Sequence, residues 1–365
     1  MKVALLDLRP QYQTIKSEIE PAVLSLMEGQ QFVLGETVRR FEENIARYCQ
    51  GGHAVGLSSG TDALLCGLMA LGISRDDEVI VPSFTFFGTA GVVARLGAKP
   101  VFVDIDTDTF NIAADRIEPA ITERTRAIIP VHLFGQMAPM SEILSLAERY
   151  DLKVIEDACQ SIGSGQNGQH PGQRSEAACL SFYPSKNLAG FGDGGLLLCR
   201  DKELAQQCRY LRVHGEDQRY YHSIIGGNFR LDALQALVLD IKLRHLEGWV
   251  AQRRAHAARY DELLAGVVQT PKISPGNVSV YNQYVIRAPQ RDELQKYLAQ
   301  KQVGTAIYYP VPLHLQKCFA YLGGREGDCP AAEQVSKEVL ALPVYPELSD
   351  EQIEYVANGI REFYQ

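Results

Sequence analysis

Through the first two-thirds of the chain, short runs rich in Val and Ile alternate with stretches of helical periodicity. Four such apolar runs lie at residues 79–82, 100–104, 127–131 and 153–157. Between the last two, residues 140–150 repeat apolar positions at helical spacing. Apolar strands separated by helices favour a mostly parallel sheet that helices cover on both faces.

The pattern changes from residue 231 onward. A long helical stretch runs to about residue 264, and we expect it to bend near Gly248. Glycines and prolines at 266–276 indicate a linker, and a strand near 284–286 and a helix at 292–300 follow. We therefore predict an α/β chain with a large domain at residues 1–245 and a smaller C-terminal α+β domain at 246–365.

Composition narrows the classes of partner. The 365 residues are 46% hydrophobic and 22% charged, so a sizeable core is available. A net charge of −8 without a long Lys/Arg run argues against a nucleic acid or an anionic membrane as partner. The first ten residues do not resemble a signal peptide, and no run has the length of a membrane span. A phosphate-bearing ligand would have to be held by local donors.

Cysteine and histidine usage points to a reduced compartment and away from metal. None of the eight cysteines has C-x-x-C spacing, and several lie inside apolar runs. We interpret them as reduced core residues of a cytoplasmic protein. The eight histidines show no metal-ligand spacing such as H-E-x-x-H, so no metal site is expected.

Two motifs follow early strands. Residues 58–63 form a small polar turn that leads into an apolar helix, and Gly60 and Thr61 lie at its start. Free N–H groups, a glycine and a hydroxyl are typical of a phosphate site, although an ordinary Ser/Thr N-cap explains the same residues. Phe86 comes just after the strand at 79–82. Its ring could stack on a flat ligand or simply pack in the core.

The apolar run at 153–157 ends in two carboxylates, Glu156 and Asp157. Ligands of open α/β sheets bind at the carboxyl ends of strands. A buried acid there needs a cation or several donors. A protonated pyridine ring is such a cation, and the carboxylate keeps it charged, as pyridoxal chemistry requires. A structural salt bridge is the alternative.

Lys186 lies 29 positions after Asp157, at the end of the next strand-like run. Most isolated lysines are solvated surface residues. One placed at a strand end can instead form a Schiff base. The glycines at 190, 192 and 195 match the dinucleotide fingerprint, but that motif needs a strand before it and a helix after it. Here the lysine loop precedes them and a strand-like run follows, so we reject that interpretation.

At these residues the sequence resembles the nucleotide-sugar aminotransferases of the DegT/DnrJ/StrS type, a branch of the fold-type I pyridoxal-phosphate enzymes. The resemblance covers nearly the whole chain, from residues 6–8 and 32–35 to 309–314, and is most specific at 181–195. It implies pyridoxal 5'-phosphate as cofactor and an aspartate-aminotransferase-like large domain. It also implies a cytoplasmic homodimer with shared active sites.

The resemblance further implies a role for each motif. Lys186 would carry the cofactor as a Schiff base and then shuttle a proton. Asp157 would hold the pyridinium nitrogen, Gln160 would contact the ring hydroxyl and Phe86 would stack on the ring.

The phosphate of the cofactor would have two sets of contacts. Gly60, Thr61 and Ser181 would hold it from the same chain. Asn228 would reach the phosphate bound by the neighbouring subunit.

The same resemblance suggests the reaction. Members that deoxygenate the sugar carry His where Lys186 stands, so Lys186 favours transfer of an amino group, with glutamate as donor. Arg230, Tyr309 and His314 would contact the substrate. We expect a keto sugar at C3, either a dTDP-linked 6-deoxyhexose or a UDP-linked N-acetyl uronate, used for amino-sugar and surface polysaccharide biosynthesis. A 4-keto sugar, a cyclitol and a regulatory protein that retains the fold are the alternatives.

Overall fold

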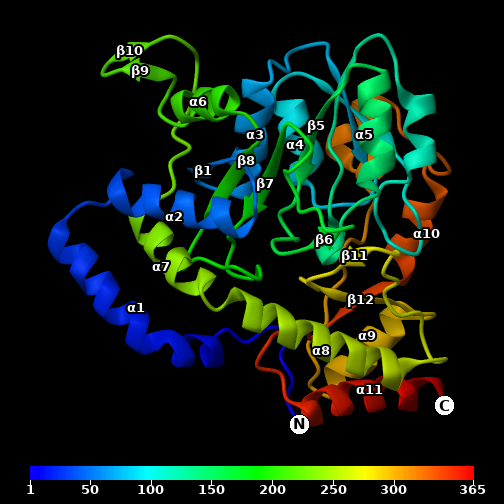
Figure 1. Cartoon of the computed structure of the whole chain (residues 1–365). Helices are drawn as coiled ribbons and strands as arrows, with labels where there is room; N and C mark the ends of the chain where they lie inside the picture. Colours follow the sequence, from blue (N-terminus) through cyan, green and yellow to red (C-terminus); the bar gives the residue numbers. More distant parts are fainter.

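The computed structural model describes residues 1–365, and its centre is a seven-stranded sheet (Figure 1). The strand order is β1-β8-β7-β5-β4-β2-β3. Only β8 runs antiparallel to its neighbours, and the other six strands share one direction. The predicted mostly parallel sheet is confirmed. The strands are β1 (His53–Leu57), β2 (Glu78–Pro82), β3 (Lys99–Val103), β4 (Thr125–Ile128), β5 (Lys153–Asp157), β7 (Ala177–Ser181) and β8 (Gly195–Cys199).

Helices cover both faces of this sheet, and successive residues of one strand face opposite layers. Leu197 packs with α3 and α6, whereas Leu196 and Leu198 pack with α2 and α7. Because both faces are buried, the middles of the strands are mostly apolar, as the sequence pattern indicated, and the charged residues lie toward the strand ends. The covering helices are α2 (Gly35–Tyr48), α3 (Gly60–Ala70), α4 (Gly88–Arg95), α5 (Met140–Arg149), α6 (Lys202–Leu211) and α7 (Ala233–Leu243).

The long helical stretch is broken before Gly248. Helix α7 ends at Leu243, and α8 (Leu246–Leu264) begins after two intervening residues. At the break, His245 accepts the backbone N–H of Trp249, and the two rings stack with centroids 5.7 Å apart. The interruption expected near Gly248 thus lies at residues 244–245, and Gly248 itself is an ordinary residue of the first turn of α8, with open space around it.

A smaller body lies at the C-terminal end of α8. Its core combines the later half of α8 with two strands, two helices and Val3, which bridges to Val303. Figure 1 shows the N-terminus beside α11. The elements of this body are β12 (Tyr284–Arg287), α9 (Arg291–Gln300), β13 (Val339–Leu342) and α11 (Asp350–Tyr364). A division at residue 245 remains our proposal, with α8 joining the two bodies.

The remaining elements decorate these two bodies. Helix α1 packs Ile15 and Ile19 against α7, and the β9–β10 hairpin stands out beside α6 (Figure 1). They are α1 (Arg9–Gly29), β6 (Gly165–Gln166), β9 (Glu216–Gln218), β10 (Tyr221–His222), β11 (Asn277–Val278) and α10 (Pro330–Glu338).

All eight cysteines are free in the structure. The expected core position is confirmed for six of them, whereas Cys318 is exposed and Cys159 is half-buried. Among the helices, none combines the length and the apolar character needed to cross a membrane.

A buried ion pair ties α2 to the sheet edge. The Arg212 guanidinium lies 2.6 Å from Glu42 Oε1, which also accepts the N–H of Gly56 at 2.7 Å. Arg212 in turn donates to the carbonyl of Gly56 at 3.1 Å. Each charge is thus satisfied only while the other is present.

Replacing Arg212 by Met should lower the free energy of unfolding by about 3–5 kcal/mol, because Glu42 is left buried without its cation. Urea unfolding followed by circular dichroism measures this loss. Arg39→Met is the matched control, since Arg39 pairs with Glu36 and Glu43 on the exposed face of the same helix. Equal losses in the two variants would contradict the account.

Candidate functional site

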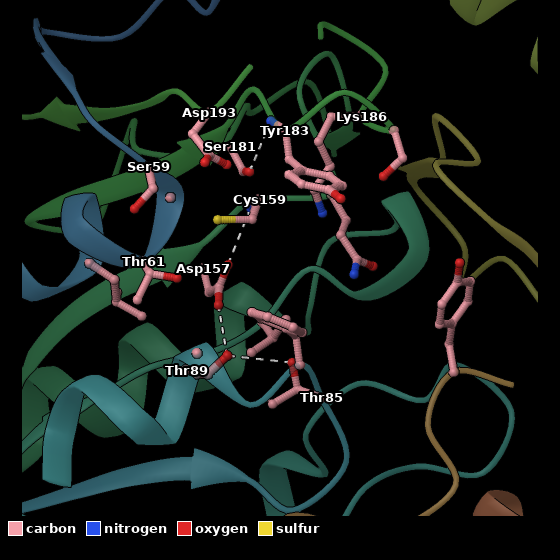
Figure 2. Close-up of a pocket in the computed structure, with 18 of the residues that line it drawn as sticks. Ser59, Thr61, Thr85, Thr89, Asp157, Cys159, Ser181, Tyr183, Lys186 and Asp193 are labelled. Carbon is pink, nitrogen blue, oxygen red and sulfur yellow. Dashed lines mark hydrogen bonds between the residues drawn. The ribbon is translucent and has the colours of Figure 1, made fainter. Parts of the chain in front are cut away.

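A cavity of about 530 Å³ opens at the carboxyl ends of the parallel strands (Figure 2). Loops after β2, β5 and β7 form most of its wall, and the start of α3 and part of the smaller body close it. Eight of the predicted site residues line it: Gly60, Thr61, Phe86, Asp157, Gln160, Ser181, Lys186 and Tyr309.

One side of the cavity is the N-terminus of α3. Ser59 caps the helix by accepting the N–H of Asp62 at 3.0 Å. The N–H groups of Gly60 and Thr61 have no partner inside the helix. A Cβ on residue 60 would come within 2.7 Å of Cys159 Sγ and 2.8 Å of Ser181 Cβ, so only glycine fits. The N-cap and the anion site are therefore compatible: Ser59 supplies the cap, and the first two N–H groups stay free.

The two carboxylates at the end of β5 have separate environments. Glu156 is buried away from the cavity, 2.6 Å from His132 Nε2, and accepts the N–H of Gly172. Since Ala138 donates to His132 Nδ1, the ring proton lies on Nε2 and points to Glu156. The structural-pair interpretation thus applies to Glu156, whereas Asp157 lines the cavity.

Asp157 is buried and held by neutral donors. Its Oδ2 accepts from Thr89 Oγ1 at 2.7 Å, and its Oδ1 accepts from the N–H of Cys159 at 3.2 Å and from the Cys179 thiol at 3.7 Å. None of these donors is a cation, so they orient the carboxylate without forming a salt bridge to it. No sequence motif pointed to Thr89, because its contact with Asp157 depends on tertiary packing of the start of α4 near the end of β5.

Lys186 reaches the same cavity from the loop after β7. Its backbone N–H donates to Tyr183 and closes a tight turn at 2.9 Å. Burial lowers the pKa of Lys186, because removing an ammonium from water is costly, although Cys159 and Asp157 act in the opposite direction. The amine is therefore less basic than an ordinary lysine.

Aromatic side chains form another wall. Phe86 is 55% exposed despite its size, so its ring is available to a flat ligand and is not simply core packing. Tyr309 lies 6.4 Å from it between centroids and accepts a hydrogen bond from Gln160 Nε2 at 3.1 Å. The Gln160 carbonyl accepts the N–H of Phe134. Burial raises the pKa of Tyr309, so its hydroxyl stays neutral.

Three predicted residues lie outside the cavity. Asn228 and Arg230 belong to a segment that bridges Val213 and Leu57, and Asn228 is exposed. His314 is buried, with Nε2 3.0 Å from Glu333 Oε1. It is turned toward α10, so substrate contact by His314 is not supported.

Several lining residues had no predicted role. Each lies next to a quoted motif or comes from the smaller body, whose contribution depends on tertiary packing. They are Ser59, Tyr183, Ser185, Asp193, Gln283 and Tyr308.

Residues 13–361 match the DegT/DnrJ/EryC1/StrS aminotransferase family. The chain belongs to this family. It is therefore an aminotransferase that uses pyridoxal 5'-phosphate.

Three solved structures of family members illustrate the likeness of fold. DesV of Streptomyces venezuelae, in complex with a ketimine intermediate, superposes with a TM-score of 0.97 at 40% identity and covers 100% of this chain and 99% of its own. An aminotransferase from Brucella abortus gives 0.96 at 38% identity, with 99% of each chain covered. NtdA from Bacillus subtilis, with the cofactor PMP bound, gives 0.93 at 32% identity, with 99% and 85% covered.

Some sequence relatives are named as a regulatory protein and others as sugar aminotransferases. The chain is 50% identical to a "Pleiotropic regulatory protein" from Geobacillus stearothermophilus, over 100% of this chain and 99% of the relative. It is 42% identical to a UDP-N-acetyl-3-dehydro-α-D-glucosamine 3-aminotransferase from Acidithiobacillus ferrooxidans, over 98% and 97%. A dTDP-3-amino-3,4,6-trideoxy-α-D-glucose transaminase from Streptomyces venezuelae is 40% identical, over 99% and 96%.

The residues present in this aminotransferase fit pyridoxal phosphate. Free helix N–H groups suit a phosphate, a carboxylate without a cation suits a protonated ring nitrogen, and an exposed aromatic suits the ring face. An amine of lowered pKa suits the aldehyde. All four line one cavity.

Replacing Thr89 by Val should weaken retention of the cofactor about 10-fold or more, because a donor to a charged carboxylate is lost. Spectrophotometric titration of the protein with pyridoxal phosphate measures this. Thr89→Ser, which keeps the hydroxyl, is the control and should bind as the parent does. Equal binding by the Val variant would show that Thr89 does not position Asp157.

Proposed function

We propose that the chain moves an amino group from glutamate to C3 of a nucleotide-linked keto sugar, with its cofactor carried on Lys186. One observation carries the chemical part of this proposal. Lys186 and Asp157 line a single cavity beside the free N–H groups of α3 and the exposed ring of Phe86. The arrangement supplies a contact for each reactive part of pyridoxal phosphate.

The bound cofactor would be held at both ends. The N–H groups of Gly60 and Thr61 and the hydroxyl of Ser181 would bind its phosphate. Asp157 would keep a proton on the ring nitrogen, oriented for this by Thr89. When bound, pyridoxal phosphate supplies an electron-poor ring that stabilises negative charge on the reacting carbon.

Lys186 would also move the proton. Because its pKa is lowered, a larger fraction of the amine is neutral than for a solvated lysine at the same pH. In the first half-reaction, its Nζ would take a proton from the reacting carbon of the amino donor and deliver a proton to the cofactor. In the second half-reaction, with the keto sugar, it would move a proton in the opposite direction, from the cofactor to the sugar carbon. Gln160 and Tyr309 hold each other beside this path and would keep the ring and the substrate in place.

The sugar carbon is inferred from the relatives. The two named aminotransferases above act, by name, at position 3, and so does a UDP-2-acetamido-2-deoxy-3-oxo-D-glucuronate aminotransferase from Pseudomonas aeruginosa at 41% identity. Their nucleotides differ, so both a dTDP-linked and a UDP-linked sugar fit. Amino-sugar and surface polysaccharide biosynthesis is the pathway class this reaction would serve. A 4-keto sugar or a cyclitol is the alternative substrate.

A homodimer with shared sites completes this proposal. Asn228 and Arg230 lie outside the cavity of their own chain, so a role in binding needs a second copy. The Arg230 guanidinium would then bind an anionic group of the substrate in the active site of the other subunit. The free cysteines support a cytoplasmic location, where thiols stay reduced.

The regulatory name of the Geobacillus relative raises a second candidate. A protein that only regulates needs no lysine of lowered pKa facing a carboxylate in a cavity. Both residues are present here. We therefore place catalysis first, and a Lys186→Ala variant with full biological effect would reverse that order.

Transfer of ¹⁵N from labelled glutamate to a panel of keto sugars tests the substrate class. We expect kcat/KM for 3-keto nucleotide sugars to exceed that for 4-keto sugars by at least about 100-fold, since the site must place one carbon beside Lys186. Mass spectrometry of the amino sugar measures the transfer. A preference for a 4-keto sugar or a cyclitol would contradict the C3 assignment and leave the cofactor chemistry standing.

A further inference from the structure

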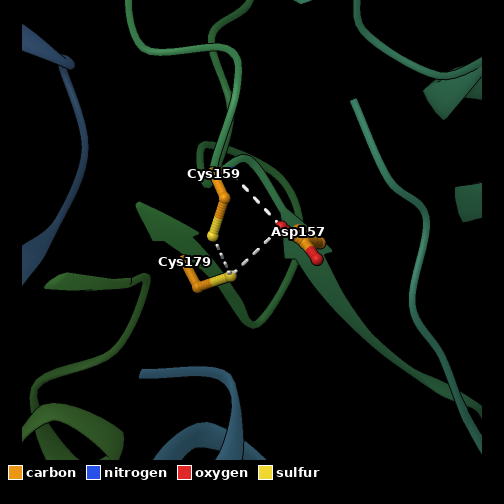
Figure 3. Close-up of side chains that lie close together, drawn as sticks. All are labelled: Asp157, Cys159 and Cys179. Atoms are coloured by element: carbon orange, nitrogen blue, oxygen red, sulfur yellow. Dashed lines mark hydrogen bonds between the residues drawn. The ribbon is translucent and has the colours of Figure 1, made fainter. Parts of the chain in front are cut away.

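Two thiols stand beside the carboxylate at the end of β5 (Figure 3). Parallel pairing of β5 with β7 puts Asp157 opposite Cys179. Cys159 lies two residues after Asp157 in the chain. The two sulfur atoms are 3.6 Å apart, and Cys179 Sγ is 3.7 Å from Asp157 Oδ1. One ligand atom of each residue lies within 4.8 Å of the other two.

These separations match the edges of a tetrahedral metal site. A Zn–S bond of about 2.3 Å places two thiolates about 3.8 Å apart around the ion. A thiolate and a carboxylate oxygen would be about 3.6 Å apart on the same geometry. The side chains would need to shift only slightly to share one ion.

The electrostatics of the group also favour a cation. Asp157 is buried, its hydrogen-bond donors are all neutral, and it forms no salt bridge, because Lys186 acts on it only from a longer distance. Cys159 lines the cavity, so an ion has a path to the group and a fourth position open to water.

We propose that Asp157, Cys159 and Cys179 bind one thiophilic divalent cation of the Zn²⁺ class when the cofactor is absent, and that this ion and pyridoxal phosphate exclude each other. The exclusion rests on the proposed function, in which the same carboxylate holds the ring nitrogen. On binding, each thiol releases its proton to solvent and forms a sulfur–metal bond, and nothing is oxidised or reduced. The ion would thus control how readily new chains take up their cofactor.

The sequence did not predict this group. The expectation of no metal site rested on histidine spacing. These ligands are instead Asp157 at the end of β5, Cys159 in the loop after it and Cys179 in β7, so the two cysteines lie 20 residues apart. Only the register of β5 and β7 brings them together.

Cadmium is a suitable probe, because thiolate–Cd²⁺ bonds absorb in the ultraviolet, away from the visible band of the cofactor. The full-length chain is titrated with Cd²⁺ before and after loading with pyridoxal phosphate. We expect one Cd²⁺ per cofactor-free chain and loss of the thiolate band as the cofactor enters. Cys179→Ser should weaken Cd²⁺ binding about 100-fold or more. Losing a residue that only supports a metal ligand typically lowers metal affinity about 10–100-fold, and losing the ligand itself should cost more.

The control is Cys318→Ser, which removes an exposed thiol outside both the cavity and the group and should bind Cd²⁺ as the parent does. Cys159→Ala gives a second test at the cavity wall should the buried Cys179 variant fold poorly. Unchanged Cd²⁺ binding in a folded Cys159 or Cys179 variant would overturn the site. Equal Cd²⁺ binding by the loaded chain would overturn the exclusion. Both readouts are independent of amino transfer, so failure of the sugar assay is a separate result.

Discussion

The site depends on one buried carboxylate that forms no salt bridge, Asp157. Taking an ionised acid out of water costs several kcal/mol unless donors or a cation compensate. Asp157 has a hydroxyl, a backbone N–H and a thiol as donors, which hold it without cancelling its charge. A protonated pyridine ring held directly against Asp157 would supply the close positive charge that the carboxylate lacks. The same imbalance explains why a thiophilic cation is expected to compete.

The fold brings the complementary groups to that carboxylate. Because six strands share a direction, their carboxyl ends meet at one edge, and β5 and β7 deliver Asp157 and Lys186 to the same cavity. The first turn of α3 adds free N–H groups. Residue 60 must be glycine there, because a side chain would collide with Cys159 and Ser181. Close packing of the smaller body then completes the wall with Tyr309.

The central sheet and the main chemical groups could be predicted from the sequence, because apolar runs and strand-end polar residues have local signatures. Features that depend on neighbours in space could not. Glu156 and Asp157 are adjacent in sequence, and only their opposite directions from β5 assign one to His132 and the other to the cavity. The resemblance assigned His314 to the substrate, yet in the structure its Nε2 lies 3.0 Å from Glu333 Oε1. Thr89 donates to Asp157 only because the fold packs the start of α4 near the end of β5.

The central claim is that Lys186 carries the cofactor next to Asp157. Borohydride reduction of the yellow protein, followed by peptide mapping, tests it most directly, because reduction fixes the bond between amine and cofactor permanently. We expect the pyridoxyl group on the peptide containing Lys186, and we expect prior addition of glutamate to prevent the labelling. A label on another lysine, or no label in cofactor-loaded protein, would contradict it.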